Sequence, residues 1–361
     1  MGKALLLFFV VSGLLSPAYA QELTLLFAGD AMQHQTQIDN AYRGGIYDYS
    51  SCFKHLKAYI SEADVAVVNL EVTLGGKPYT GYPMFSAPDE YAAALKEAGF
   101  DVFLTANNHS LDRRKKGLER TIRVLDSLEV RHLGTYVDRE EKAKNYPIIW
   151  TEKGIRVAFL NYTYGTNGIH VTPPNVVNYI DTTQIKNDIR NARGALGADV
   201  IIACVHWGME YKLVQNPAQE QLAGWMVREG VDLIIGSHPH VVQPAQVWRN
   251  EQGEITNLVI YSLGNFISGM TQVNTNGGQI VKVVLSKEDF HTKIKSCSYR
   301  LIYVDKQKNG NKLDYTLLPV DAFENRKDSL STVSYNPMTT FAKNARSLFA
   351  KYNEEEIREA P

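Results

Sequence analysis

Two histidines separated by one proline follow an apolar run near the middle of the chain. The run stops at Gly236 and Ser237, and His238, Pro239 and His240 come directly after it. The proline stiffens the turn between the histidines, so both imidazoles can point into one site at a strand end. Neutral imidazole is a ligand for zinc, manganese and iron. An isolated pair of this kind fits a surface loop equally well, so its interpretation depends on the rest of the chain.

Four more polar clusters stand where apolar runs end. They are Asp30, Glu71, Asn108 with His109, and His206. Each has an ordinary structural explanation, because such residues also cap helices, occupy turns or are hydrogen-bonded in a core. Five clusters at five strand ends are hard to explain separately, and together they indicate one shared polar site. Its mixture of carboxylate, amide and imidazole groups favours a divalent transition metal over calcium, which prefers oxygen ligands.

Hydrolysis of a phosphoester or a related bond is the chemistry that this set could perform. Two divalent ions about 4 Å apart clamp a phosphate ester and lower the pKa of a water molecule between them. His109 is then a candidate proton donor to the leaving group, and Asp112 would fix its tautomer if the intervening turn is helical. The candidate substrate-binding residues stand beside these clusters in the sequence: Asn107, Glu210, Tyr211 and Tyr164.

The elements that must position these residues alternate along the chain. Apolar strand-like runs occupy 23–28, 64–70, 101–105, 155–162, 199–205, 231–235, 258–263, 279–285, 298–304 and 313–317. Helical spacing occupies 51–62, 88–98, 117–128, 181–193, 217–229 and 338–352, with Asp181 as one expected helix cap. This order predicts a layered α/β domain, in which ligands bind beyond the carboxyl ends of the strands.

A long loop, 164–180, interrupts this alternation. Loops of that length in a compact domain are often lids. A solvent-exposed loop with no role in binding explains the length equally well. In the first case Tyr162, Tyr164 and Asn167 are expected to line the mouth of the pocket.

The composition is that of an ordinary globular protein. The 361 residues are 44% hydrophobic and 21% charged, and the net charge of −1 gives no reason to expect nucleic acid as a partner. Three cysteines, Cys52, Cys204 and Cys297, are too few for a disulfide framework, and Cys204 is expected to be a buried small hydrophobe.

The first twenty residues have the pattern of a cleavable secretory signal. Lys3 precedes an apolar run over 4–15, and Ala18 and Ala20 provide small residues at the positions that a signal peptidase needs. The run is short for an uncleaved membrane anchor, and no later run is long enough to span a bilayer. We therefore expect an exported protein, periplasmic or otherwise extracytoplasmic, whose mature chain starts near Gln21.

Six motifs, all in the same order, resemble those of the CapA/PgsA-type capsule-synthesis proteins. They are Gly29-Asp30, Asn69-Leu70-Glu71, Ala106 to Asp112, His206 to Tyr211, Gly236 to Pro244 and Tyr261 to Phe266. The resemblance implies a role in the synthesis or export of poly-γ-glutamate or another capsule polymer. It also implies the four-layer α/β/β/α sandwich of the calcineurin-like metallophosphoesterases. On this basis we expect that domain over 21–325, followed by a C-terminal helix and polar tail over 326–361.

The resemblance assigns a role to each residue of the site. It implies Asp30 and His240 at one metal ion, His206 and His238 at a second, Glu71 between them, Asn108 as a further ligand and His109 as the catalytic histidine. The cofactor would be one or two ions of manganese, iron or zinc. Two departures from the phosphoesterase pattern bear on this number: Asp30 is followed by Ala31 and Met32 where the pattern has a histidine, and Glu71 replaces an aspartate. His34 is nearby, but its spacing differs.

Two functions therefore remain open from the sequence. One is a metal-dependent hydrolase that acts on a phosphoester or a related ester or amide. The other is an assembly or export factor in a capsule-synthesis complex, which binds an anionic polymer and keeps the site as a carboxylate-binding or structural pocket.

Overall fold

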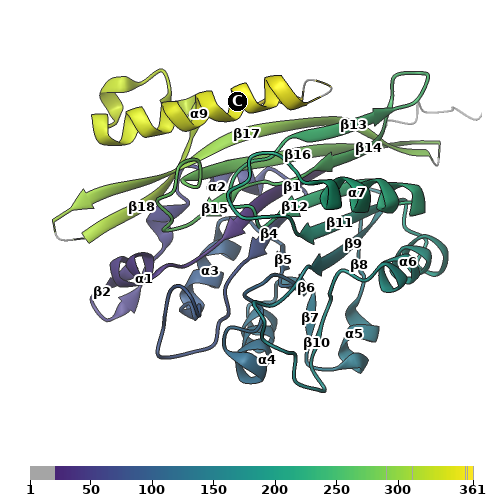
Figure 1. The fold of residues 1–361 in the computed structure, drawn as a ribbon, viewed down its shortest axis with the longest axis horizontal. Helices are drawn as coiled ribbons and strands as arrows, with labels where there is room; N and C mark the ends of the chain where they lie inside the picture. Colours follow the sequence, from purple (N-terminus) through teal and green to yellow (C-terminus); the bar gives the residue numbers. More distant parts are fainter. Residues whose placement is uncertain (1–20, 290, 311, 354, 356, 361) are drawn as a thin grey trace, which may run out of the picture.

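The computed structural model describes residues 21–289, 291–310, 312–353, 355 and 357–360. The predicted signal segment, 1–20, lies outside the described residues. Within them the chain has a mixed α/β fold, in which helices surround a large central sheet system (Figure 1). The path of hydrogen-bonded strands divides into two halves, because β14 (Ile255–Ile260) and β17 (His291–Asn309) are joined only at the pair Ile255 and Ile294.

The first half is built around β1 (Gln21–Ala31). This strand pairs in parallel with β4 (Val65–Leu70) and antiparallel with β16 (Gly277–Glu288). The other strands of this half are β5 (Val102–Leu104), β6 (Arg131–Leu133), β15 (Asn265–Ile267), β18 (Lys312–Pro319) and β19 (Arg358–Glu359). Because β1, β4 and β5 are parallel, the polar residues that follow them meet at one edge of the sheet.

The second half has four parallel strands at its centre. These are β9 (Ile155–Thr163), β11 (Val200–His206), β12 (Leu233–Ser237) and β14. Two antiparallel strands flank them, β8 (Ile148–Glu152) and β13 (Ala245–Arg249). Two small ladders lie apart: β2 (Tyr42–Arg43) with β3 (Ile46–Tyr47), and β7 (Thr135–Tyr136) with β10 (Val176–Val177).

Helices surround the two halves. They are α1 (Gln35–Ala41), α2 (Lys57–Ser61), α3 (Asp89–Glu97), α4 (Arg114–Ser127), α5 (Arg139–Asn145), α6 (Thr182–Arg190), α7 (Pro217–Glu229), α8 (Val320–Phe323) and α9 (Thr332–Tyr352). Shorter turns are η1 (Ser50–Cys52), η2 (Asn191–Ala195) and η3 (Lys327–Ser329). Among the described residues, no helix combines the length and the apolar character that crossing a bilayer requires.

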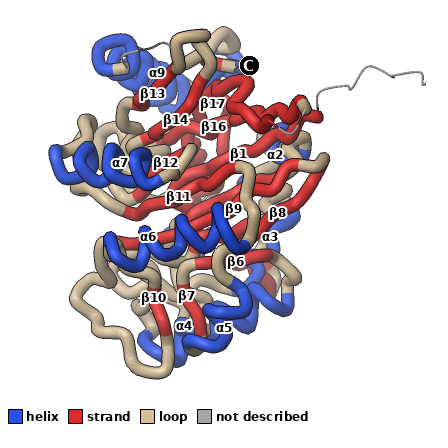
Figure 2. Tube along the Cα trace, turned by 90° about the vertical axis from the view of Figure 1, so that its right-hand side faces the viewer, coloured by secondary structure: helices blue, strands red, loops and turns tan. Residues whose placement is uncertain are grey.

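The alternation of side chains along β1 creates the layers. Leu25 and Phe27 belong to the same core as Leu160 of β9, so this core lies between the two halves. Leu26 points the other way, into a second core that includes Leu95 of α3. Figures 1 and 2 show α6 and α7 on one side of the strands and α2 and α3 on the other. The order is helix, sheet, sheet, helix, and the predicted α/β fold is confirmed.

Glycines allow the two halves to approach closely beside the carboxyl ends of the strands. A Cβ atom on Gly29 of β1 would lie 1.9 Å from the carbonyl oxygen of Gly264. A Cβ atom on Gly236 of β12 would lie 2.0 Å from the carbonyl oxygen of Tyr261. Real Cβ atoms do not tolerate such distances, so the backbone segment 261–264 fits between β1 and β12 only because both positions lack a side chain.

Most of the expected elements are present, with three informative differences. The strand expected at 258–263 is β14 and ends at Ile260, because the chain turns at Gly264, where φ is +70°. The helix expected at 51–62 is divided into η1 and α2. The long loop contains β10, which pairs with β7, so it is tied to the domain. Asp181 caps α6 by accepting from the backbone of Gln184, and Cys204 is a free, buried cysteine, both as predicted.

Candidate metal centre

The polar clusters that end the strands meet in one buried site between the two halves. Asp30 and Glu71 come from the ends of β1 and β4, whereas His206 and His240 follow β11 and β12. His240 Nδ1 lies 3.1 Å from Asp30 Oδ2. Glu71 Oε1 lies 3.5 Å from His206 Nε2 and 3.8 Å from His240 Nε2. All four side chains are buried, so their charges interact without much screening by water.

The turn through His238 and His240 is held in an unfavourable backbone conformation. The φ angles are 98° at His238 and 58° at His240, in the left-handed region that side chains other than glycine rarely adopt. Each such residue costs about 1–2 kcal/mol, which the surrounding contacts must offset. One of these contacts is the hydrogen bond that the backbone N–H of His238 donates to Asp30 Oδ2, at 3.3 Å. The turn thereby directs both imidazoles into the site.

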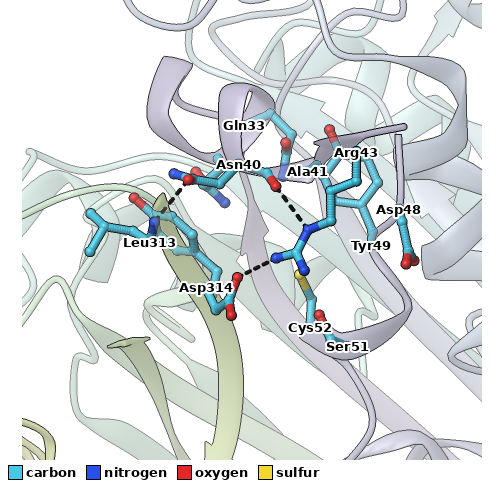
Figure 3. A pocket seen from close by; sticks show the side chains of 12 residues that line it. Gln33, Asn40, Ala41, Arg43, Asp48, Tyr49, Ser51, Cys52, Leu313 and Asp314 are labelled. Atoms are coloured by element: carbon cyan, nitrogen blue, oxygen red, sulfur yellow. Dashed lines mark hydrogen bonds and ion pairs between the residues drawn. The ribbon is translucent and has the colours of Figure 1, made fainter. Parts of the chain in front are cut away.

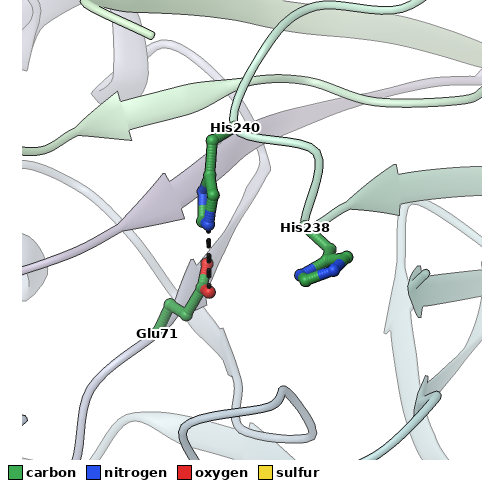
Figure 4. Close-up of side chains that lie close together, drawn as sticks. All are labelled: Glu71, His238 and His240. Atoms are coloured by element: carbon green, nitrogen blue, oxygen red, sulfur yellow. Dashed lines mark ion pairs between the residues drawn. The ribbon is translucent and has the colours of Figure 1, made fainter. Parts of the chain in front are cut away.

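Two overlapping groups of side chains have the geometry to hold a metal ion. One comprises Glu71, His238 and His240 (Figure 4), and the other comprises Asp30, Glu71 and His206. Within each group the candidate ligand atoms lie within 4.8 Å of one another. Glu71 Oε1 and His238 Nδ1 are buried without any hydrogen-bond partner among the described residues. Buried polar atoms without partners are rare, and a divalent ion would satisfy both, so the residues fit a metal.

Burial and mutual charge shift the protonation of these groups. Burial, and then the charge of Asp30, raises the pKa of Glu71 well above its usual value. Burial raises the pKa of Asp30 too, but the hydrogen bond and charge of His240 and the hydrogen bond from Asn69 outweigh it, so this pKa is lowered. Burial, followed by the charges of neighbouring histidines, lowers the pKa of His206 and brings that of His238 to about 3. Imidazoles that stay neutral are available as ligands.

His109 and Asp112 form a hydrogen-bonded pair at the edge of the site. His109 Nδ1 lies 2.7 Å from Asp112 Oδ2, and the same oxygen accepts from the backbone N–H of Phe85 at 2.7 Å. The Phe85 ring packs edge-on against His109, with centroids 4.6 Å apart. The carboxylate therefore holds the proton of His109 on Nδ1 and leaves Nε2 free to exchange a proton with a substrate.

The two asparagines that precede His109 have different environments. Asn108 Oδ1 lies 3.0 Å from His206 Nε2, inside the site. The side chain of Asn107 is satisfied internally, because its amide donates to Asn69 Oδ1 and to the carbonyl of Leu70 while its oxygen accepts from the backbone of His109. Its contacts in this structure are thus those of a residue that positions its neighbours.

Two partly exposed tyrosines stand beside the buried histidines, and an exposed glutamate precedes one of them in the chain. The ring of Tyr164, 48% exposed, lies 4.6 Å from that of His238, and the ring of Tyr211, 42% exposed, lies 6.4 Å from that of His240. Glu210 beside Tyr211 is exposed. Asn167, from the long loop, accepts a hydrogen bond from Asn108 at 3.3 Å.

The expectation that Tyr162 lines the mouth of the pocket is wrong. Its side chain is fully buried, and its hydroxyl donates to Asp188 Oδ2 of α6 at 2.8 Å. Residues 162 and 164 would share a face if the strand continued, but β9 ends at Thr163, so Tyr164 lies outside the strand and the alternation does not apply to it.

Sequence reasoning did not assign a role to Asn69 or Ser237, which also contact the site, whereas Asn265 was a possible pocket donor in the motif that ends at Phe266. Asn69 donates to Asp30 Oδ1 at 2.8 Å, and Ser237 Oγ lies 3.0 Å from His206 Nδ1. Asn265 Oδ1 lies 3.1 Å from His240 Nδ1. Each of these residues lies within or next to one of the recognised motifs. The position of Asn69 and Ser237 beside a candidate ligand at a strand end was the feature of the sequence that could have identified them. His34 lies beside the site, where its Nδ1 accepts from the backbone of Gly269 at 3.1 Å.

A small separate cavity lies between α1, η1 and β18 (Figure 3). An ion pair between Arg43 and Asp314 closes one side, and the backbone of Leu313 donates to Asn40 at 2.8 Å. None of the candidate site residues lines this cavity. It has no part in the chemistry of the metal centre.

The fold and the site together define an α/β protein with a buried candidate metal centre between two sheets. The chain belongs to the family of the bacterial capsule synthesis protein PGA_cap, whose family model matches residues 24–270. The matched part contains every candidate residue of the site, from Asp30 to His240.

Two curated relatives are named as biosynthesis proteins. The chain is 31% identical over 276 residues to the capsule biosynthesis protein CapA of Bacillus anthracis, which covers 73% of this chain and 64% of the relative. It is 27% identical over 210 residues to the PGA biosynthesis protein CapA of Bacillus subtilis (strain 168), covering 55% and 50%. The matched part of the chain thus spans between half and two thirds of the length of these relatives.

Among solved structures, the chain is similar to the calcineurin-like phosphoesterase YfkN from Bacillus subtilis. The alignment covers 91% of this chain and 100% of that chain, with 14% sequence identity and a TM-score of 0.46.

Proposed function

We propose that this chain is a metal-dependent hydrolase that serves capsule-polymer synthesis or export outside the cytoplasm. It would cleave a phosphoester or a related ester or amide bond. The observation that carries this proposal is the buried group of Glu71, His238 and His240, in which Glu71 Oε1 and His238 Nδ1 lack partners. Such atoms are costly to bury unless an ion satisfies them, and the paired His109 and Asp112 lie next to the group.

The chain supplies the ligands and the proton-transfer group of this reaction. A divalent ion of zinc, manganese or iron would supply electrostatic stabilisation of an oxygen and an activated water molecule. His109 donates a proton to the leaving group through Nε2, because its Nδ1 proton is engaged by Asp112. Asp112 keeps the imidazole oriented, and its own position is held because the same oxygen accepts from the backbone of Phe85.

The opening of the site is suited to hold the group that leaves. Tyr164 and Tyr211 are partly exposed and their rings lie beside those of His238 and His240, so we take this side of the site as the one from which a substrate approaches. Tyrosine offers both an apolar ring face and a hydroxyl to a ligand. Glu210 adds a negative charge at the same opening, which favours neutral or cationic groups there.

A non-catalytic role in assembly is the second candidate. Two features favour it: the names of the curated relatives describe biosynthesis and not hydrolysis, and the sequence has Met32 where the phosphoesterase pattern has a histidine. In this role the chain would bind an anionic polymer in a capsule-synthesis complex, and the histidine site would have a structural purpose.

Metal analysis of the purified mature protein, followed by a screen of phosphodiesters and phosphomonoesters, separates these candidates. The hydrolase should carry a stoichiometric divalent metal and lose turnover when His109 is replaced by alanine, with its metal retained. His238→Ala should lose the metal itself, because one imidazole of a small ligand set is hard to replace. Protein expressed with manganese, iron and zinc available, yet purified without metal, would leave only the assembly role.

Export is part of the proposal and has its own test. The pattern over 1–20 implies a mature chain that starts near Gln21. N-terminal sequencing of the protein recovered outside the cytoplasm should find this start. An intact Met1 on a membrane-embedded product would contradict it.

A further inference from the structure

The amide group of Asn69 contacts all three residues of one of the two candidate ligand groups. Its Nδ2 atom lies 2.8 Å from Asp30 Oδ1, 3.3 Å from His206 Nδ1 and 3.5 Å from Glu71 Oε2. These are the three residues of the second candidate group. The side chain of Asn69 is 2% exposed, so it has no alternative position in solvent. An N–H donor there engages the lone pairs of Asp30 Oδ1 and His206 Nδ1, which are then not available to a cation.

The orientation of this amide is determined by the backbone around it. Asn107 must present its oxygen to the backbone N–H of His109, at 3.1 Å, and its nitrogen to the carbonyl of Leu70, at 2.9 Å. The same nitrogen of Asn107 donates to Asn69 at 3.2 Å, so the atom of Asn69 that faces it must be the oxygen. The nitrogen of Asn69 therefore faces the ligands. Turning either amide over would place donor against donor.

The other candidate group is left open by the same hydrogen-bond network. His240 Nδ1 lies 3.1 Å from both Asp30 Oδ2 and Asn265 Oδ1. The oxygen of Asn265 is identified because its nitrogen donates to the carbonyl of Thr275 at 2.8 Å. Both neighbours of Nδ1 are acceptors, so Nδ1 carries the hydrogen and Nε2 keeps a lone pair directed toward Glu71.

Every ligand atom of the open group is thus prepared for an ion. His240 Nε2 has its lone pair, 3.8 Å from Glu71 Oε1, and both Glu71 Oε1 and His238 Nδ1 have no hydrogen-bond partner among the described residues. A ring N–H that is held by a carboxylate is the usual outer support of a histidine that ligates a metal. Asp30 provides that support to His240.

We propose that the site binds one divalent ion per chain, at Glu71, His238 and His240, and that the amide of Asn69, by engaging Asp30 and His206, keeps the second group from binding another ion. This proposal rests on the metal-dependent function above. Two imidazoles and one carboxylate leave a coordination position for water, as in mononuclear zinc hydrolases. Asp30 and His206 then act as positioning residues, and the ligand assignments that the family resemblance implied for Asp30, Asn108 and His206 are replaced.

The number of ions per chain tests the proposal directly. Metal-free protein is equilibrated with zinc or with manganese, freed of unbound metal, and analysed for metal and protein content, with calorimetric titration as a second measurement. We expect one ion per wild-type chain. Asn69→Asp should raise the number to two, because a carboxylate then completes the second group in place of the amide donor. Asn178→Asp, a buried asparagine outside the site, is the matched control and should remain at one.

Two further variants keep the test decisive if Asn69→Asp does not fold. His206→Gln should retain one ion, whereas His240→Gln should lose it. Two ions on the wild-type chain, or a drop from two to one in His206→Gln, would overturn the single-ion proposal while leaving the hydrolase proposal intact. No bound ion on folded wild-type protein would overturn both. The number of ions bound per wild-type chain therefore distinguishes failure of the single-ion proposal from failure of the hydrolase proposal.

Discussion

Replacing Glu71 with glutamine should stabilise the metal-free protein. Burial, and then the charge of Asp30, raises the pKa of Glu71, so the folded state retains a proton that the unfolded chain releases above about pH 4.5. A raised carboxyl pKa contributes stability only below the unfolded value and costs stability at neutral pH. Glutamine removes this cost.

The same substitution should abolish stabilisation by metal. An ion present at about 100 times its Kd stabilises the folded wild-type protein by about 2.7 kcal/mol. Glu71 is the carboxylate shared by both candidate groups, so its loss removes one of three ligands from either. If the affinity falls by about a thousandfold, the remaining stabilisation at the same metal concentration is below about 0.1 kcal/mol. With about 2 °C per kcal/mol for a large domain, a gain in Tm of about 5 °C should disappear.

Thermal unfolding of both proteins, with chelator and with zinc or manganese, measures the two effects. Asp188→Asn is the matched control, because Asp188 is another buried carboxyl with a pKa raised by burial, outside the site. It accepts from Tyr162 and Gln184, so its replacement should lower Tm yet leave the metal-dependent gain unchanged. A Glu71→Gln protein that is less stable without metal, or that retains the full gain with metal, would refute the reasoning.

Three further predictions concern single residues around the centre. His109→Ala should keep its metal and lose turnover on a phosphodiester by about a hundredfold or more, as measured by metal content and kcat. Tyr164→Ala should raise KM with a smaller effect on kcat, because its exposed ring contacts His238 at the opening; an unchanged KM would place the substrate elsewhere. Burial lowers the pKa of His34 to about 4 from 6.5, so its contribution to stability is complete above pH 6.5 and is lost as the pH falls. At about pH 5 the loss is about 2 kcal/mol, and His34→Gln should reduce the acid destabilisation of the metal-free protein by that amount in chemical denaturation; equal pH dependence in both proteins would contradict it.

The sequence was most informative where local pattern and tertiary structure agree. Apolar runs such as 64–70 and 199–205 are buried strands, and the polar residues after them meet because parallel strands place their carboxyl ends at one edge. This property of parallel strands was enough to predict from the sequence that Glu71, His206 and His238 lie close together.

The rest of the site could not be predicted because it depends on contacts between distant segments. The direction of the Asn69 amide follows from hydrogen bonds that involve Asn107 and the backbone of His109, and no spacing in the sequence encodes them. Tyr162 was misplaced for a related reason: whether it faces the pocket or Asp188 is decided by the packing of α6 on β9. Pattern predicts which side chains reach an edge, and packing decides which way each one turns.

The glycines that let the two halves meet are needed for the fold, whereas the histidines beside them are needed for the proposed metal binding. Relatives of this chain could therefore keep the glycines and lose the histidines. Gly29 and Gly236 are required by the backbone of 261–264 whether or not the neighbouring histidines bind anything. A descendant that exchanged His238 and His240 for other residues would still need both glycines to close its sheets. In a survey of such proteins, the glycines would identify common descent. Retention of Glu71 with the two histidines would identify the lineages that kept the capacity for catalysis.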